Sequence, residues 1–221
     1  MDQGAALSAS TRRWRRVVLG GLAILGVAIV AFGPLGVALR MLSMPLHRLR
    51  WQDWVMTWNG VGLITVLALP VAVLVVCVLA VRRRGAGVAS PWQRSLAEAG
   101  IVYWTLPCVW LTLQPGPRAG SAPGQVILVP LRDLLTMDTG QIVGNLLVFA
   151  ALGFFAPLRF AALASLPRIL ALAAGCSALI EIAQYVLRLD RVSSVDDVLL
   201  NAAGAGLAAL VSRPWWSADG R

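Results

Sequence analysis

An unbroken apolar run is the feature of this sequence that most restricts its fold. Residues Val61–Val81 read VGLITVLALPVAVLVVCVLAV and contain no charged or amide side chain. About 20 apolar residues in a helix cross the hydrocarbon core of a bilayer, and a backbone in lipid must satisfy its own hydrogen bonds. The run lacks the alternation of polar and apolar residues that a membrane β-barrel strand has. It therefore predicts a helix that spans a membrane.

The rest of the chain repeats this pattern. Of its 221 residues, 58% are hydrophobic and 13% are charged, with a mean hydropathy of +0.77, whereas a soluble domain carries roughly 25% charged residues. We expect an all-α, polytopic membrane helix bundle of about six transmembrane helices. The stretch RRRGAGVASP divides the chain into a two-helix unit, residues 1–90, and a four-helix unit, residues 91–221. The predicted spans are Val17–Leu39, Val61–Val81, Leu96–Leu113, Gln141–Leu158, Ile169–Leu187 and Asp197–Val211.

The distribution of arginines predicts the orientation of the chain in the membrane. With the N-terminus inside, twelve arginines fall in cytoplasmic segments and seven in outer ones, and the clusters RRWRR and VRRRG directly border spans. Cytoplasmic loops are enriched in Arg and Lys, so we expect both termini in the cytoplasm. The net charge of +9 does not indicate a nucleic-acid partner, because the arginines flank apolar runs instead of forming a basic stripe with aromatic residues. Membrane lipids with anionic headgroups are the expected partners.

One acidic residue lies deep inside a predicted span. Glu181 precedes Arg188 by seven residues, which places it about 10 Å below the membrane boundary in a helix that rises ~1.5 Å per residue. A charged side chain at mid-span costs of order 2.5–3.5 kcal/mol and marks a candidate functional residue. Gln184 and Arg188 share the helix face of Glu181. By contrast Glu98, at the inner start of its span, can reach water or Arg94 and is interpreted as a solvated end charge.

The neighbouring spans carry polar residues at a similar depth. Asn145 lies roughly 6 Å below the outer surface, and Asn201 lies at a similar depth on the same helix face as Asp197. Because the last three helices alternate in direction, we expect their polar groups to form a cleft that opens outward. The candidate catalytic residues are Glu181 and Asp197. The candidate binding residues are Asn145, Gln184, Arg188, Arg191, Asp196, Asn201 and Arg132.

A purely structural explanation exists for part of this cluster. Ser194-x-x-Asp197 is a capping-box pattern with Asp in place of Glu or Gln, and aspartates in a first turn favour the positive helix end by ~0.3–1 kcal/mol. Taken alone, Asp196 and Asp197 are explained by capping. The amide side chains can equally form hydrogen bonds between helices, worth ~0.6 kcal/mol each. So weak a bond does not offset the burial of the Glu181 carboxylate unless that group is neutral or paired, for instance with Arg188 or Arg191.

Three stretches near the end of the chain carry a family resemblance: GNLLVFAALGFFAPL, LIEIAQYVLRLDRVSSVDDVLLNAAGAGLA and the loop segment ILVPLRDL. Over residues 101–211 the chain resembles the VanZ-like family of bacterial membrane proteins, with its NxxxFxPxG-type helix, its E-x-x-Q helix and its D-x-x-D-x-x-x-N-x-x-G helix. The chain departs from this pattern at Ala151, where the family often has proline, and at Ser193, near a position that is often acidic. Carried over by position, the family's residues are Asn145, Glu181, Gln184, Arg191, Asp197, Asn201 and Gly204.

The resemblance implies a multi-pass protein of the bacterial plasma membrane that acts at the cell envelope. A named member of the family is associated with low-level resistance to the glycopeptide teicoplanin, but membership implies no particular reaction. A lipid-linked envelope precursor or a lipophilic glycopeptide is therefore an expected ligand. No pattern identifies a cofactor. The cysteines Cys77, Cys108 and Cys176 stand isolated in apolar segments, far along the chain from the one histidine, so they predict no metal site.

Several functions fit these residues. The leading hypothesis is an envelope protein whose outward cleft binds the polar group of a lipid-linked molecule or lipophilic antibiotic, with Arg132, Arg188 and Arg191 on its phosphate or carboxylate. An enzyme that uses Glu181 as general acid or base is one alternative, although the sequence has no nucleophile motif and no HExxH. A proton-coupled small-molecule transporter and a structural partner subunit of a membrane complex are the others. Transport is disfavoured because LGFFAPL, ILALAAG and GAGLAALV, the inner halves of the last three spans, hold no ionisable residue.

Overall fold

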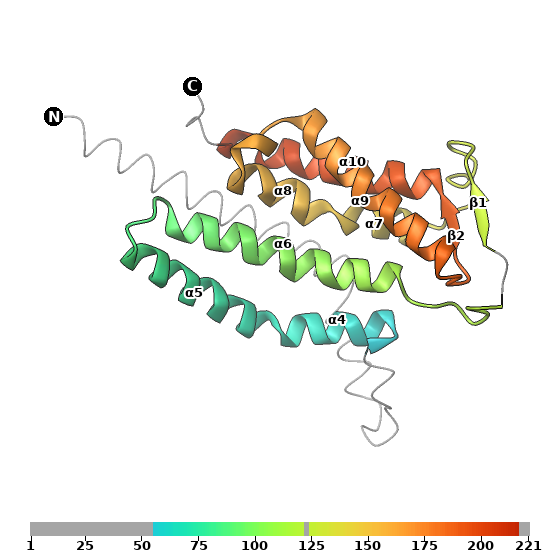
Figure 1. Ribbon diagram of the computed structural model, residues 1–221, viewed down its shortest axis with the longest axis horizontal. Coiled ribbons are helices and arrows are strands. Elements are labelled where there is room, and N and C mark those ends of the chain that lie inside the picture. The colour runs from blue at the N-terminus through green and yellow to red at the C-terminus, as the bar shows by residue number, and fades with distance from the viewer. Residues whose placement is uncertain (1–54, 122–123, 217–221) are drawn as a thin grey trace, which may run out of the picture. The chain divides into compact units, whose positions relative to one another are not determined.

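The structure, a computed structural model, describes residues 55–121 and 124–216. Within this part the chain is mainly helical (Figure 1). It divides into two compact units, Met1–Leu67 and Ala68–Arg221. The first predicted span, Val17–Leu39, lies outside the described residues. The described part of the first unit contains helix α4 (Trp58–Leu67).

The second unit is a helix bundle in which α9 and α10 lie on one side and α5 on the other, with α8 and α6 between them (Figure 1). Helix α10 packs against α7, α8 and α9, while α6 packs against both α5 and α8. Two short strands pair at one end of the bundle. The elements are α5 (Leu69–Gly85), α6 (Pro91–Thr112), β1 (Gln125–Ile127), α7 (Thr139–Val148), α8 (Ala150–Arg159), the 3₁₀ turn η2 (Ala161–Leu163), α9 (Leu166–Val186), β2 (Val192–Ser194), α10 (Val195–Ser212) and the 3₁₀ turn η3 (Arg213–Trp215).

Three described helical segments are long and apolar enough to cross a membrane: Thr139–Arg159, Leu166–Val186 and Val195–Trp215. They correspond to the last three predicted spans, and the shortest of those gains length because Ser194 caps its start and η3 continues its end. Helices α4 and α5 meet the same criterion only when they are counted together as one broken span. Helix α6 has sufficient length, but its acidic and hydroxyl residues lower its hydropathy, and it is not among these candidates. The described residues thus contain three to four candidate membrane-spanning helices; six spans and cytoplasmic termini stay predictions.

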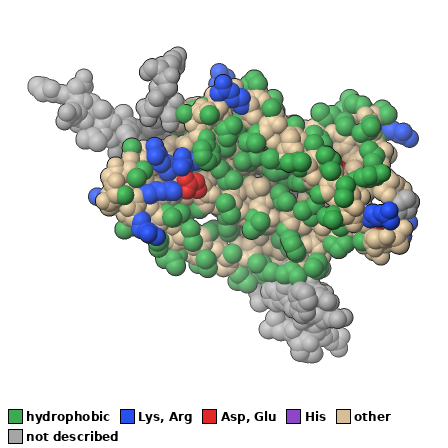
Figure 2. Space-filling view, in the orientation of Figure 1, with side chains coloured by type: hydrophobic (Ala, Val, Ile, Leu, Met, Phe, Trp, Pro, Cys, Tyr) green, Lys and Arg blue, Asp and Glu red, His purple; other side chains and the backbone are tan. Residues whose placement is uncertain are grey.

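The surface of the described helices agrees with an apolar surrounding. Hydrophobic side chains are spread over the whole visible face of the described residues in Figure 2, and large ones such as Leu74, Val102 and Leu106 are more than half exposed. In water such a surface would promote association, since exposed apolar patches of this extent mark interaction sites. A lipid environment removes that conflict.

Small residues bring the backbone of α10 into contact with the backbones of α7 and α8. A methyl group at Gly204 would collide with the carbonyl group of Leu146, and one at Gly153 would collide with the carbonyl group of Ala205. Because the neighbour is backbone in both cases, no side chain can move aside. These two contacts set the depth and rotation of α10, and hence the position of its polar first turns. Buried alanines fill the surrounding core: Ala156, Ala173, Ala202, Ala205 and Ala209.

The segment that forms α7 and α8 is interrupted at Phe149, whose φ is −110° and ψ is 16°. The indole N–H of Trp104 in α6 donates to the carbonyl oxygen of Leu147 at 2.8 Å. That carbonyl lies four residues before Ala151, so it is the partner of the Ala151 N–H in an ideal helix. Ala151 is the position where the resembled family often has proline. The helix is therefore interrupted here without a proline, and an indole from another helix satisfies a carbonyl at the break.

We call the end of the bundle that contains residues 113–121, 124–138 and 187–194 the loop end. Strand β1 pairs in parallel with β2, in the register Gln125 to Val192 and Ile127 to Ser194. The backbone of residues 113–121 also bonds that of residues 187–194, since the N–H of Gly116 donates to the carbonyl of Leu189 at 2.8 Å. Strand β2 leads directly into α10, so these contacts hold the start of α10 in place.

Candidate functional site

The carboxyl group of Glu181 in α9 faces the start of α10 and not lipid. The residue is only 9% exposed. Its Oε2 accepts a hydrogen bond from the backbone N–H of Ser194 at 2.9 Å, and its own carbonyl oxygen accepts one from the Ser193 hydroxyl at 2.9 Å. Asp197, on the first turn of α10, is close enough to interact electrostatically with it. Glu181 therefore lies inside the protein, within electrostatic range of a second carboxyl group.

Asp197 turns toward the third helix of the site. Its Oδ1 accepts a hydrogen bond from the amide nitrogen of Asn145 in α7. Arg191 is the one cation among the groups that interact appreciably with this carboxyl group, against the acids Asp133 and Asp196. Three helices, α7, α9 and α10, thus bring one amide and two carboxyl groups together.

The predicted capping box forms only in part. The hydroxyl of Ser194 caps α10, but it accepts from the N–H of Asp196 at 3.1 Å and not from that of Asp197. In a complete capping box the side chain three residues after the cap, here that of Asp197, would accept a hydrogen bond from the N–H of Ser194. Here Glu181 takes that N–H from the neighbouring helix. This exchange leaves the Asp197 carboxyl group available for Asn145.

Asp196 holds the loop end together. Its carboxylate is 2% exposed and accepts three backbone N–H bonds, from Leu131 at 2.6 Å, Asp133 at 2.9 Å and Leu134 at 3.0 Å. Leu131 has a φ of +65°, a left-handed conformation that costs a non-glycine residue roughly 1–2 kcal/mol. Charge-assisted bonds of this kind are stronger than neutral ones, so the contact can hold that conformation. We call this contact the Asp196 clamp; both carboxylate oxygens are engaged by the chain's own backbone.

Two buried side-chain amides form a hydrogen bond through the amide nitrogen and none through the amide oxygen. Gln184 donates from Nε2 to the carbonyl of Thr112 at 2.9 Å, and Asn201 donates from Nδ2 to the hydroxyl of Ser177 at 2.7 Å. Within the described part of the chain, Gln184 Oε1 and Asn201 Oδ1 are buried and have no hydrogen-bond partner. A buried acceptor without a partner costs about 1–3 kcal/mol. Each is therefore a free acceptor for a donor group from outside the chain.

The three predicted arginines lie on the loops. Arg191 donates from Nε to the carbonyl of Gln114 at 3.2 Å, while Arg132 and Arg188 are exposed. The prediction that Arg188 shares the helix face of Glu181 is wrong, because α9 ends at Val186. Arg188 adopts a φ of +49° in a Schellman-type end, with the N–H of Leu189 bonded to the carbonyl of Gln184 at 3.1 Å.

The interpretation of Glu98 as a solvated end charge that reaches Arg94 is also corrected. Glu98 lies at the opposite end of the helices and forms ion pairs with Arg83 of α5 and Arg159 of α8. Sequence spacing along one helix could not reveal partners 15 and 61 residues away.

We call Glu181, Asp197, Asn145, Gln184 and Asn201 the polar cluster. The sequence pattern of the VanZ/LLP1 family matches residues 99–216, more than half of the chain. The chain belongs to the VanZ/LLP1 family. The matched region runs from α6 to Trp216 and includes the whole polar cluster and the Asp196 clamp, so the VanZ-like resemblance predicted over residues 101–211 is confirmed. No curated protein and no solved structure matches the chain.

Sequence reasoning missed two side chains of the VanZ/LLP1 region that support the cluster. Ser177 lies four residues before Glu181, so helical spacing could have placed it on the same face. Ser193 contacts the carbonyl of Glu181 only because β2 folds back on α9, and no spacing in the sequence predicts that. The outward-opening cleft between α7, α9 and α10 stays a prediction.

Proposed function

We propose that this VanZ/LLP1 protein acts at the envelope face of the bacterial plasma membrane, where its polar cluster binds the polar head of a lipophilic molecule. The ligand class is a lipid-linked envelope precursor or a lipoglycopeptide such as teicoplanin. The observation that carries the proposal is the approach of two carboxyl groups, Glu181 and Asp197, on neighbouring helices. Two acids are not placed together in an apolar bundle for stability alone, because like charges repel and burial penalises both.

The donors and acceptors of the site define the chemistry of the ligand. Carboxyl and amide oxygens of the polar cluster accept hydrogen bonds from hydroxyl or ammonium groups. The arginines on the loops, Arg132, Arg188 and Arg191, bind phosphate or carboxylate. A headgroup with a sugar or amine and a neighbouring phosphate or carboxylate satisfies both sets. The free acceptors Gln184 Oε1 and Asn201 Oδ1 add to the same preference.

An enzyme that acts on the bound molecule is the second candidate. The electrostatic interaction between Glu181 and Asp197 on neighbouring helices favours it, since two carboxyl groups within one site can serve as general acid and base. Incubation of the purified protein with envelope glycolipids tests this candidate, which requires a chemically changed product. A proton-coupled transporter has less support, because residues 169–180 and 198–212 hold no acidic or basic side chain that would continue a route through α9 and α10.

Two variants test the binding site and a third serves as the control, and each of the three replaces one acidic side chain by the corresponding amide. Glu181→Gln keeps an oxygen that can accept from Ser194, Asp197→Asn keeps the shape of the side chain, and Asp138→Asn is the control. Asp138 lies at the loop end and is exposed, where it caps α7 by accepting from the N–H of Gln141 at 3.0 Å. Its neutralisation therefore changes the charge of the same end without touching the polar cluster.

The readouts are the lipids that co-purify with each variant and the teicoplanin tolerance of cells that produce it at equal membrane levels. We expect the wild type and Asp138→Asn to retain the same headgroup class, and Glu181→Gln and Asp197→Asn to lose most of it. Tolerance should fall in the same two variants. Equal lipid content and equal tolerance in all four proteins would reject the polar cluster as the functional site.

A further inference from the structure

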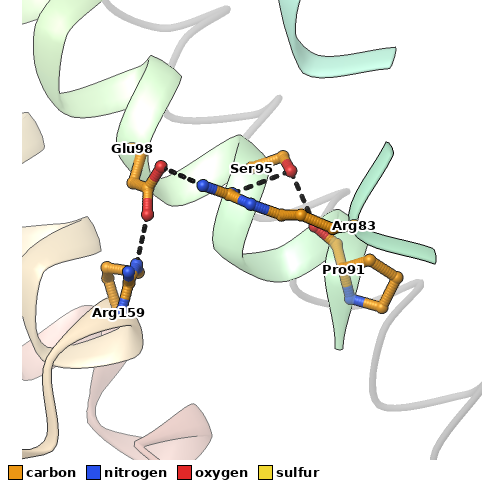
Figure 3. Close-up of polar contacts among 5 residues, drawn as sticks. All are labelled: Arg83, Pro91, Ser95, Glu98 and Arg159. Carbon is orange, nitrogen blue, oxygen red and sulfur yellow. Dashed lines mark hydrogen bonds and ion pairs between the residues drawn. The ribbon is translucent and has the colours of Figure 1, made fainter. Parts of the chain in front are cut away.

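A second charged site lies at the end of the helices opposite the loop end, and Figure 3 shows its residues. The carboxylate of Glu98 in α6 accepts from Nη2 of Arg83 in α5 at 2.5 Å and from Nε of Arg159 in α8. Nη1 of Arg83 also donates to the hydroxyl of Ser95 at 2.9 Å, and that hydroxyl donates to the carbonyl of Pro91 at 2.8 Å. One carboxylate thus links two guanidinium groups across three helices.

This site carries a surplus of positive charge. Two guanidinium groups share one carboxylate, and the side chains of Arg83, Glu98 and Arg159 are only 23%, 30% and 27% exposed. Among the described residues, Glu98 is the one acid at this end, and Figure 2 shows basic side chains gathered around an acidic one. A half-buried cation without a counter-ion is unfavourable, so the site favours an added anion. Further arginines at the same end are Arg82, Arg84, Arg94, Arg168 and Arg213.

The guanidinium group of Arg159 has donors that the described residues leave unused. Its Nε is bonded to Glu98, and its guanidinium lies 4.8 Å from the centre of the Phe160 ring, which holds the plane of the group. Within the described part of the chain its two terminal amino groups have no protein partner. A guanidinium fixed in this way presents a planar fork that matches two oxygens of a phosphate.

The surroundings of the site indicate where the phosphate comes from. Large hydrophobic side chains next to the charged residues are exposed, at Val81 in α5, Trp92 in α6 and Phe160 after α8. Exposed indole and phenyl rings beside arginines are typical of the boundary between acyl chains and headgroups. A free phosphate ion makes no favourable contact with the exposed side chains of Val81, Trp92 and Phe160. A phospholipid can place its phosphate on the arginines and its acyl chains on these apolar side chains.

We propose that Arg83 and Arg159 bind the phosphate of an anionic membrane phospholipid, which supplies the second negative charge that Glu98 alone does not provide. The site is separate from the polar cluster, which lies at the other end of the bundle. Its occupancy can be measured whether or not the polar cluster binds a ligand.

Titration of the full chain in a neutral detergent tests the proposal, with the number of bound lipids read by native mass spectrometry. The titrants are phosphatidylglycerol, phosphatidylcholine and inorganic phosphate. The variants are Arg159→Gln, Glu98→Gln and, as a charge-matched control, Arg168→Gln, because Arg168 lies at the same end but donates only to the carbonyl of Ala162 at 2.8 Å. We expect phosphatidylglycerol to bind more tightly than phosphatidylcholine and inorganic phosphate not to displace it.

The arginine and glutamate variants should change the affinity for phosphatidylglycerol in opposite directions. Arg159→Gln should weaken phosphatidylglycerol binding about tenfold, the size expected for loss of a hydrogen bond to a charged group, and Arg168→Gln should change it little. Glu98→Gln should strengthen binding, because it removes the negative charge that competes with the lipid. A network that serves only to hold helices together predicts instead that Glu98→Gln and Arg159→Gln both lower stability and that neither raises affinity. That result would overturn the proposal. Equal losses of phosphatidylglycerol affinity in Arg159→Gln and Arg168→Gln, or displacement of the lipid by inorganic phosphate, would also overturn it.

Discussion

Replacement of Gly204 by alanine tests the packing that places α10. The added methyl group would collide with the backbone of Leu146, and the two helices must move apart because no side chain can yield. Overpacking typically costs 1–3 kcal/mol, and a backbone obstacle places this case at the upper end, about 3 kcal/mol. The gain in helix propensity from glycine to alanine offsets only about 0.5–1 kcal/mol. We therefore expect a net loss of about 2 kcal/mol in the free energy of unfolding.

Gly175 provides the matched control, because it is a helical glycine in α9 and a Cβ built there meets no atom within 4 Å beyond its own stretch of helix backbone. Gly175→Ala should gain about 0.5–1 kcal/mol through propensity alone. Unfolding by increasing mole fractions of SDS, followed by circular dichroism, measures both variants in the same micelles. Gly153→Ala should behave like Gly204→Ala, and the double variant should lose less than the sum, since one separation of the helices relieves both collisions. A Gly204→Ala protein as stable as Gly175→Ala would refute the argument.

Three further changes have defined outcomes. Asp196→Asn weakens the Asp196 clamp, so the free energy of unfolding should fall by about 1–3 kcal/mol. Trypsin should also cleave faster after Arg132, which gel electrophoresis of timed samples measures. An unchanged cleavage rate would contradict the role of the clamp. Leu131→Gly relieves the backbone at φ +65° and should raise the unfolding free energy by up to about 1 kcal/mol, whereas Leu135→Gly, at a neighbouring residue that is 88% exposed, should not. Trp104→Phe removes the donor to the Leu147 carbonyl and should cost about 1 kcal/mol in the same SDS titration, with Trp92→Phe, at a residue of α6 that is 45% exposed, as the comparison.

The parts of the fold that follow from short-range rules were predictable. Apolar length alone predicted the spans Gln141–Leu158, Ile169–Leu187 and Asp197–Val211, because lipid permits few alternatives. They correspond to the helical segments Thr139–Arg159, Leu166–Val186 and Val195–Trp215. Helical rise and periodicity placed Asn145 and Asn201 at a similar depth and put Asp197 on the helix face of Asn201. In the structure Asp197 bonds Asn145 and interacts electrostatically with Glu181.

The parts that depend on contacts between distant segments were not predictable. The spacing Ser194-x-x-Asp197 indicated a cap, but the acid that completes it comes from another helix. The pairing of Glu98 with Arg159 depends on how α6 packs against α8. The role of Gly204 becomes clear only when the backbone of Leu146 lies against it. In each case the local pattern identified a residue of interest, and tertiary packing decided its partner.

The bond between Ser194 and Glu181 has a consequence for any occupant of the polar cluster. The same carboxylate oxygen that would attract a headgroup already completes the N-terminal cap of α10. A molecule that recruits this oxygen must release an amide at the helix start, so ligand affinity and the integrity of the first turn of α10 are thermodynamically linked. A ligand that binds this oxygen should therefore increase fraying of the first turn of α10, and a variant in which that turn is already frayed should bind the ligand more tightly.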